Sequence, residues 1–306
     1  MAELIRSSAP HIHSKNNSQR IMLDVIIALI PAVVASALIF GTKALLLEGV
    51  CIASAVAAEY VYDLIAKREN TISDLTAVVT GLLLGLNLST RVELWQAALG
   101  SVFAIVVAKC IFGGLGKNFA NPAITGRVFM LIVFASVAGG ANPSSFELVS
   151  SATPLELAFD AGRPTLGTLL LGMHGGCVGE TCVIALVLGY AYLVARDVIR
   201  WYVPATFIGT VFVLYLLFTG DVSLALYEIL SGGLFLGAIF MATDYVTTPI
   251  TNKGKLVFAA GCGIITFVIR CFLSYPEGVS FSILFMNLLV PVIEKFTKNK
   301  VLGGAK

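Results

Sequence analysis

Long apolar stretches alternate with short polar segments along the whole chain. A helix that crosses a membrane needs about 20 predominantly apolar residues, and most of the stretches approach that length. They cover residues 22–40, 44–65, 74–89, 93–112, 126–140, 177–195, 201–219, 223–243, 256–274 and 279–296. The segments 74–89 and 126–140 are short, so a tilted, buried or broken helix is an alternative to a plain span for each. The pattern predicts an all-α, polytopic membrane protein of about ten transmembrane helices.

The composition excludes a soluble domain. Hydrophobic residues make up 58% of the 306 residues and charged residues only 12%, whereas soluble domains carry about a quarter charged residues. A soluble chain of this length would need polar side chains to cover its surface. The net charge of +2 gives no sign of a nucleic-acid partner, so the partner surface that we expect is lipid.

Positive charges divide the connecting segments into two groups. If the N-terminus is cytoplasmic and the spans alternate, fifteen Lys and Arg residues fall inside and three fall outside. The inside residues are Arg6, Lys15, Arg20, Lys67, Arg68, Lys117, Arg127, Arg196, Arg200, Lys253, Lys255, Lys295, Lys298, Lys300 and Lys306, and the outside ones are Lys43, Arg91 and Arg163. Cytoplasmic loops of membrane proteins retain the positive charge. Both termini are therefore predicted to be cytoplasmic, in the inner (cytoplasmic) membrane of a cell.

This topology divides the chain into an arm, a membrane domain and a tail. Residues 1–20 are predicted to form a cytoplasmic N-terminal arm, 21–296 the membrane domain and 297–306 a cytoplasmic C-terminal tail. The longest non-spanning stretch, 141–176, falls outside the membrane, and loops of that length are usually functional or disordered. It ends in an apolar piece that is too short to span.

Two segments of the chain echo each other. The sequence GSVFAIVVAKCIFGGLGKNFANPAITGRVF, from Gly100, resembles GGLFLGAIFMATDYVTTPITNKGKLVF, from Gly232. Each holds an apolar helix, a loop with a small residue and proline, and a second helix, which predicts an internal repeat of the kind found in transporter-like folds. The alternative is that helix–loop–helix units look alike by composition. The predicted topology places both loops on one side, which a simple inverted repeat would not do.

Three glutamates lie within or beside predicted spans. Burying a carboxylate at membrane depth is costly, so Glu59, Glu180 and Glu228 are candidates for an ion or proton path. The competing interpretation is that they pair with Lys109 or Arg270, or with a partner subunit. No histidine or cysteine spacing indicates a metal site, although a cysteine could still ligate a cluster shared with a partner. GGLGKN at 113–118 lacks the spacing of a phosphate-binding loop.

An exposed hydroxyl follows in the long loop. Thr153 comes after Ser150, Ser151 and Ala152 and directly precedes Pro154. Proline disfavours a helical conformation of the residue before it, so a modifying enzyme could reach the Thr153 hydroxyl. From spacing alone, an ordinary Ser/Thr-rich loop or a helix start remains the stronger interpretation.

The tetrad resembles a known attachment motif. It is similar to the flavinylation motif D/E-x-x-S/T-G/S-A-T, with Glu147 where Asp is commoner and Ser151 where Gly is commoner. Further segments, TAVVTGLLLGLNL (76–88), GGLGKNFANPAITGR (113–127), MHGGCVGETC (173–182) and ATDYVTTPIT (242–251), resemble those of one family. The chain is identified from about residue 20 to 296 as similar to the D subunit of the Rnf ion-translocating electron-transport complex. That family is homologous to the B subunit of the sodium-pumping NADH:quinone reductase. The short N-terminus favours the Rnf subunit, because the reductase subunit carries a longer cytoplasmic extension.

The resemblance implies a flavoprotein function. FMN would be held by a phosphoester on Thr153, within the attachment motif of Ser150, Ser151 and Ala152, after maturation by a flavin transferase. The subunit would relay electrons between ferredoxin and NAD in a complex that moves Na+ or H+, beside the FMN-bearing G subunit and the other Rnf subunits. Asn121 and Arg127 are expected flavin contacts, and a second, non-covalent flavin (riboflavin) is associated with the family. The fold would be urea-transporter-like, which leaves a stand-alone solute channel or transporter as the alternative function.

Overall fold

The computed structural model describes residues 17–68, 71–134, 165–273 and 278–298, and its regular secondary structure there is entirely helical. The elements are α1 (Ser18–Phe40), α2 (Thr42–Ala66), η1 (Ile72–Asp74), α3 (Thr76–Leu86), α4 (Leu94–Phe103), η2 (Ala104–Cys110), α5 (Pro122–Val133), α7 (Leu166–Leu171), α8 (Val183–Ala195), α9 (Tyr202–Thr219), α10 (Val222–Leu230), α11 (Leu234–Leu236), η3 (Gly237–Met241), α12 (Asn252–Phe272) and α13 (Gly278–Thr297).

The predicted all-α membrane class is confirmed. Five helices, α1, α2, α9, α12 and α13, are long and apolar enough to cross a membrane unaided. A sixth span results if α10 and α11–η3, which bend by 66° at their junction, are counted together. The other four predicted segments contain apolar helices of 10 to 17 residues. How those four shorter helices cross stays a prediction.

Helix α3 is a short helix buried inside the protein. Its eleven residues extend about 16 Å, roughly half of a hydrocarbon core of about 30 Å. Every residue of α3 except Val78 is buried. Gly81 and Gly85 let α3 lie directly on the backbone of α2, because a Cβ atom at Gly81 would come 2.6 Å from the Cys51 carbonyl oxygen. Small residues spaced in this way allow close helix packing in membranes.

The predicted span 177–195 is wrong in its first third. Helix α8 begins only at Val183, and the residues before it pair with the end of α3. The Val178 amide donates to the Leu88 carbonyl at 3.0 Å, and the Gly179 amide donates to the Leu86 carbonyl at 2.7 Å. This non-helical segment donates to carbonyls at the end of α3 that have no partner within the helix. The short helices α3 and α8 are thus each extended by irregular backbone that is buried in protein.

Two further predicted spans differ at their ends. Helix α5 begins at Pro122, four residues before the predicted start, because the Asn121 side chain caps it and Pro122 takes the first helical position. The predicted span 223–243 is interrupted at 231–233, where Gly232 has a φ of 68°. That left-handed conformation favours glycine.

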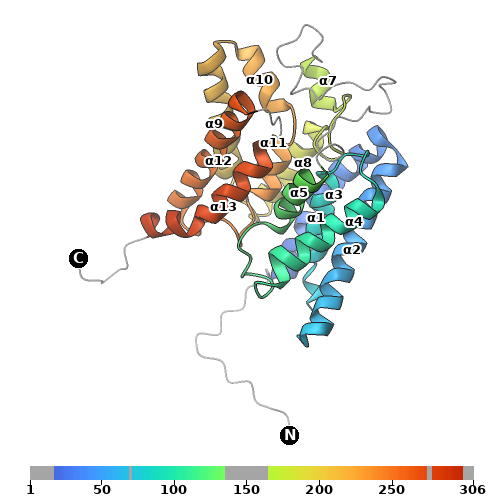
Figure 1. Cartoon of the computed structure of the whole chain (residues 1–306). Coiled ribbons are helices and arrows are strands. Elements are labelled where there is room, and N and C mark those ends of the chain that lie inside the picture. The colour runs from blue at the N-terminus through green and yellow to red at the C-terminus, as the bar shows by residue number, and fades with distance from the viewer. Residues whose placement is uncertain (1–16, 69–70, 135–164, 274–277, 299–306) are drawn as a thin grey trace, which may run out of the picture.

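The helices form two groups that meet along the middle of the molecule (Figure 1). On one side α2 packs against α3 and α4, and on the other α9 packs against α10 and α12. Helices α1 and α8 contact each other between the groups, where Gly189 lies on the backbone of Ala28. Buried apolar side chains of both groups belong to one continuous cluster, so the two groups share a single core.

The echoing segments share a local structure. Helix α4 continues into the π-helix η2, and α11 continues into the π-helix η3. Amides there bond five residues back, from Ile111 to Val106 at 3.0 Å and from Ala242 to Gly237 at 2.7 Å. In both segments an irregular stretch follows, and a side-chain-capped helix, α5 or α12, then begins. Such π segments are rare and are frequent at functional sites.

Candidate cofactor cavity and its buried charge network

A cavity lies between the two groups of helices, at the ends of the π segments. It holds about 760 Å³ of empty space, a figure that includes the open solvent at its mouth. Most of its wall is apolar and comes from α1, α3, η3 and the C-terminal end of α8. The residues in the wall with polar side-chain groups are Thr76, Thr80, Lys109, Asn118, Asn121, Thr243, Asp244 and Tyr245. We call this space the interhelical cavity.

Asn121 connects the two echoing segments beside this cavity. Its Oδ1 accepts from the amide of Ala123 at 3.0 Å, which caps α5, and its Nδ2 donates to the Met241 carbonyl at 3.2 Å. Asn287 of α13, with its amide oriented to satisfy both neighbours, accepts from the Asn121 amide at 3.1 Å and donates to the Thr247 carbonyl at 3.0 Å. The start of α5 is thereby fixed to the end of η3 and to α13.

Asn118 differs from Asn121 in having a buried acceptor that is not used. It lines the interhelical cavity, and its Oδ1 is buried without a hydrogen-bond partner among the described residues. A buried polar atom in that state costs free energy, so the position is suited to a ligand that supplies a donor. The loop that holds it passes through Gly113, Gly114 and Gly116, all with positive φ, as expected for glycines that allow a tight backbone path.

Asp244 forms another part of the wall of the interhelical cavity. Its carboxylate accepts from the Val246 amide at 3.2 Å and from the Thr247 hydroxyl at 2.9 Å. Desolvation by the surrounding groups raises the pKa of this carboxyl above its ordinary value, and the two hydrogen bonds oppose that rise. The loop between η3 and α12 therefore presents a half-buried acid to the cavity.

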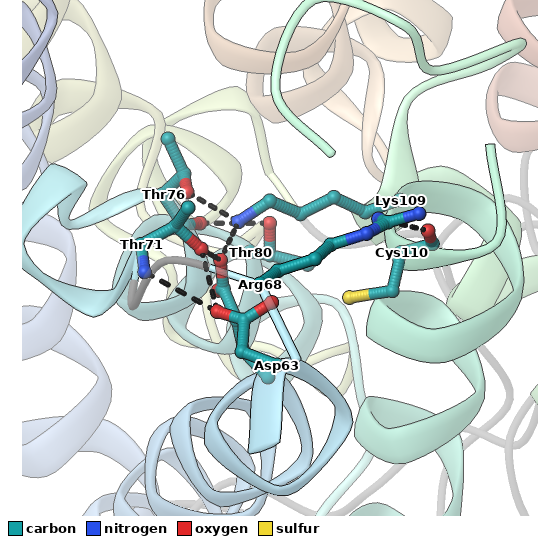
Figure 2. Close-up of polar contacts among 8 residues, drawn as sticks. Asp63, Arg68, Thr71, Thr76, Thr80, Lys109 and Cys110 are labelled. Carbon is teal, nitrogen blue, oxygen red and sulfur yellow. Dashed lines mark hydrogen bonds and ion pairs between the residues drawn. The ribbon is translucent and has the colours of Figure 1, made fainter. Parts of the chain in front are cut away.

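Lys109 brings a positive charge to the wall of the interhelical cavity. Its side chain is 2% exposed, and its Nζ lies 2.5 Å from Oε1 of Glu59, which is 1% exposed. The same Nζ donates to the Thr76 hydroxyl at 2.5 Å. Figure 2 shows the lysine reaching from η2 toward Thr76 of α3. The pair joins α2 to η2 across fifty residues of sequence.

A second carboxylate lies next to this ion pair. The Thr71 hydroxyl is 2.5 Å from Glu59 Oε1 and 3.0 Å from Asp63 Oδ2, and the Thr71 amide also donates to Asp63 at 3.2 Å. Arg68, beside them in Figure 2, donates to the Cys110 carbonyl at 3.1 Å. The C-terminal end of α2 is thus joined to the C-terminal end of η2 by polar groups from three chain segments.

A comparison with known protein families identifies the chain. The model of the NQR2, RnfD, RnfE family matches residues 5–303. The chain belongs to this family. The resemblance inferred from the flavinylation tetrad and the four signature segments is therefore confirmed.

Curated relatives of the family resemble the chain over almost its full length. The D subunit of the Na+-translocating ferredoxin:NAD+ oxidoreductase complex of Acetobacterium woodii is 43% identical, covering 98% of this chain and 95% of the relative. The D subunit of the proton-translocating ferredoxin:NAD+ oxidoreductase complex of Clostridium ljungdahlii is 38% identical, covering 95% and 94%. The D subunit of the ion-translocating oxidoreductase complex of Cronobacter sakazakii is 33% identical, covering 97% and 98%.

The predicted site residues of this family member fall into separate places. Asn121 lines the interhelical cavity, whereas Arg127 does not and instead donates from Nη2 to Cys177 Sγ at 3.3 Å. Ser150, Ser151, Ala152 and Thr153 lie outside the described residues. The attachment of FMN at Thr153 therefore stays a prediction.

The three glutamates are buried, and two of them have the pairing that the competing interpretation anticipated. Glu59 pairs with Lys109, and the Glu228 carboxylate lies 3.8 Å from Arg270. Glu180 accepts from the Cys177 amide at 3.1 Å and lines a second, smaller cavity with Asn87 and Ser280. None of these contacts tests an ion path, and the roles of all three remain predictions.

Sequence reasoning missed Lys109 and Asn118 as wall residues of the cavity. The sequence indicated Lys109 only as a pairing partner for a buried glutamate. It indicated Asn118 only as one residue of the signature segment 113–127. The available signal was the N-x-x-N-P spacing that ends at Pro122, directly after a glycine-rich turn. No group of three or more His, Cys, Asp or Glu side chains in the described parts of the chain is placed to hold a metal ion.

Proposed function

We propose that the chain is the D subunit of an Rnf-type ion-translocating ferredoxin:NAD+ oxidoreductase complex. The observation that carries the proposal is the identity of 43% to a subunit of that name, with nearly complete coverage of both chains. Other subunits of the complex, the FMN-bearing G subunit first, are its proposed partners. The chain alone would not complete the reaction.

The first part of the proposal is a covalent flavin on Thr153. The support is the tetrad Ser150-Ser151-Ala152-Thr153 in a chain that belongs to the family. A flavin accepts electrons singly or in pairs, and the protein positions it and sets its potential. A threonine hydroxyl is a weak nucleophile at neutral pH, so attachment of FMN through a phosphoester would require a flavin transferase.

The second part is a non-covalent flavin, of the riboflavin type, in the interhelical cavity. Most of the wall is apolar and a small set of polar groups interrupts it, as a flat amphipathic ring requires. The unused Oδ1 of Asn118 would accept from a ring N–H, and Lys109 would place a cation beside the ring. Asn121 would position the loop, since both ends of its own amide are already bonded to protein.

The third part concerns sidedness and ion coupling. We propose that the termini and the loop 113–127 face the cytoplasm, that Thr153 faces outward, and that electron flow through this subunit helps to move Na+ or H+. The separation of basic residues supports the orientation. So does the position of α7, which lies at the opposite end of the molecule from the C-terminal end of α2 (Figure 1).

The flavin proposal is tested with the chain coexpressed with an active flavin transferase. On an illuminated denaturing gel the native band should fluoresce, and Thr153→Ala should be dark while it still inserts into the membrane. Mass measurement of the peptide that contains Thr153 identifies the attached group. Electron transfer through the assembled complex should fall sharply in the variant, because a carrier is then missing.

Two results would count against the covalent site. A fluorescent Thr153→Ala band would move the attachment to another hydroxyl, Ser150 or Ser151 first. A native band that stays dark, with the transferase active on another substrate, would favour the alternative of a stand-alone channel or transporter.

The orientation is tested separately by cysteine labelling from outside the cell. Single cysteines are placed at positions 145 and 300 after the native cysteines have been replaced. Position 145 should be labelled and position 300 protected. The reverse pattern would overturn the proposed topology.

A further inference from the structure

We propose that Asp63, Thr71, Glu59 and Lys109 form a proton relay that supplies the interhelical cavity from the end of α2. The inference rests on the proposed function, in which that cavity holds a flavin. Reduction of a flavin ring by two electrons is completed by protons, so a buried ring needs a route for them. The four residues are the one continuous chain of titratable and hydroxyl groups that the described contacts place between this cavity and the end of α2.

A buried ion pair is a weak source of stability. Two charges removed from water lose several kcal/mol of hydration each, and their attraction offsets this loss only with excellent geometry. Apolar residues of similar volume would stabilise the folded protein about as much as the ion pair does. The Glu59–Lys109 pair is almost fully buried, so its presence at the wall of a cavity calls for a role beyond packing.

The Thr71 hydroxyl lies between two carboxyl groups but has a single hydrogen. It can donate to Glu59 Oε1 or to Asp63 Oδ2, which lie at 2.5 and 3.0 Å, and its oxygen can accept at the same time. Both contacts are hydrogen bonds when one carboxyl carries a proton and donates to the hydroxyl oxygen. The geometry therefore suits one proton that is held at either Asp63 or Glu59.

Three buried side chains with ionisable groups gather around the Thr71 hydroxyl. The two carboxyls of Asp63 and Glu59 face one ammonium, that of Lys109. Arg68 is exposed and directs Nη1 to the Cys110 carbonyl. Glu59 also has an unused acceptor, since its buried Oε2 has no hydrogen-bond partner in the described parts of the chain.

The two ends of the four-residue relay lie near the surface and at the wall of the cavity. Asp63 is three residues from the end of α2, next to the exposed Lys67 and Arg68, and Thr71 is half-buried. At the inner end, Lys109 and its hydrogen-bond partner Thr76 both line the interhelical cavity. Protons can thus enter near the surface and leave at the wall of the cavity.

Each transfer is balanced. Asp63 gives its proton to the Thr71 oxygen while the Thr71 hydroxyl proton moves to Glu59 Oε1, which leaves Asp63 ionised, Thr71 unchanged and Glu59 neutral. At the inner end, the Lys109 ammonium would break one N–H bond and donate that proton to a flavin held in the interhelical cavity. Glu59 then restores the Lys109 ammonium and returns to a carboxylate. Electrons reach the ring through the redox carriers of the complex, and none passes along these residues.

The test compares Thr71→Val with Thr71→Ser in the assembled complex. Valine keeps the shape and removes the hydroxyl, whereas serine keeps the hydroxyl. The dissociable flavin is first quantified after denaturation, and its reduction by dithionite is then followed in rapid mixing. Thr71→Val should slow this reduction by at least about tenfold, within the range that a positioned proton donor contributes, and Thr71→Ser should stay close to native.

An infrared measurement reports the proton itself. Electrochemically induced difference spectra of the native complex should show a protonated carboxyl band that shifts in D2O and disappears in the double variant Asp63→Asn/Glu59→Gln. Thr266→Val, which removes a buried hydroxyl bonded to Ser282 at 2.8 Å in the other group of helices, is the control and should leave rate and band unchanged. If Thr71→Val does not assemble, Asp63→Asn should give the same slowing, because the amide cannot accept the incoming proton.

The outcomes separate the relay from the proposal on which it rests. A native complex without dissociable flavin would overturn the flavin assignment and the relay together. A native complex that holds the flavin, with Thr71→Val as fast as native, would overturn the relay alone. Equal slowing by valine and serine would show a packing role for Thr71. A band that persists in Asp63→Asn/Glu59→Gln would exclude these two carboxyls as the proton carriers.

Discussion

The Arg270 guanidinium holds Glu228 through both its backbone and its side chain. Nη1 donates to the Glu228 carbonyl at 2.7 Å and lies 3.8 Å from the carboxylate, while Nη2 donates to the Ser231 carbonyl at 3.2 Å. Both carbonyls belong to the end of α10, where the chain bends by 66° before α11. The last carbonyls of a helix lack intrahelical partners, so α12 supplies donors that stabilise this break.

We expect Arg270→Met to destabilise the protein more than Glu228→Gln does. Loss of the guanidinium leaves a buried carboxylate without its counter-charge and two carbonyls without their donor, and breaking a buried pair costs about 3–5 kcal/mol. The Gln variant keeps both carbonyl contacts. Thermal unfolding of the detergent-purified protein measures the difference, and equal losses in the two variants would contradict the role given to the carbonyl contacts.

A second prediction concerns the packing of α3 on α2. Gly81→Ala should destabilise the protein, because its Cβ would lie 2.6 Å from the Cys51 carbonyl oxygen and 2.7 Å from the Ile52 Cα. These are backbone atoms, so the helices must separate. Gly49→Ala in α2 is the matched control, since its Cβ meets nothing within 4 Å and alanine is favoured over glycine in a helix by about 1 kcal/mol. Thermal unfolding of both variants should show opposite shifts.

A third prediction tests Asn118 as a contact of the ligand in the interhelical cavity. Asn118→Leu should weaken retention of the dissociable flavin by about three- to tenfold, the range for one net hydrogen bond. The covalent flavin on Thr153 should be unaffected. Lys117→Gln, in the same loop but outside the wall of the cavity, is the control. Titration of flavin-depleted protein with riboflavin gives the affinities, and unchanged binding by Asn118→Leu would remove this residue from the site.

A fourth prediction addresses ion coupling. Each of Glu59, Glu180 and Glu228 is changed to Gln, and ion uptake into vesicles is measured beside the yield of complex. We expect at least one variant to lose uptake more than assembly, because carboxylates at this depth are costly to retain. Glu180 is the favoured one, since it lines a cavity with Asn87 and Ser280. Normal uptake by all three would make them structural.

The long helices could be predicted directly from the chain. The bounds of α1, α2, α9, α12 and α13 lie within four residues of the predicted spans, because an uninterrupted apolar run leaves the backbone no partner except itself in a membrane. The start of α8 could not be predicted in this way. It depends on amides of Val178 and Gly179 that bond to carbonyls some ninety residues earlier, which no local pattern encodes. The break at Gly232, in contrast, had a local signal in its paired glycines.

Single residues of the candidate site could be predicted from the sequence, but their arrangement in space could not. Glu59 and Lys109 stood out as charges within apolar runs, and their pairing was one of two interpretations. That Lys109 also lines a cavity with Asn118 and Asp244 depends on how three loops and helix ends converge. The flavinylation tetrad could be recognised from a motif alone, and its surroundings lie outside the described residues.

The π-helix η2 also fixes the register of the chain around Lys109. A π turn accommodates one residue more than an α turn, and each residue of an α-helix advances the side-chain direction by about 100°. Deleting one residue from 104–108 would let an ordinary helix form through η2 with every hydrogen bond intact. Lys109 would then be turned away from Glu59, and an apolar neighbour would take its place at the cavity wall. The extra residue of the π turn therefore sets the direction of Lys109, the only buried lysine among the described residues. The site depends on this extra residue as much as on the lysine itself.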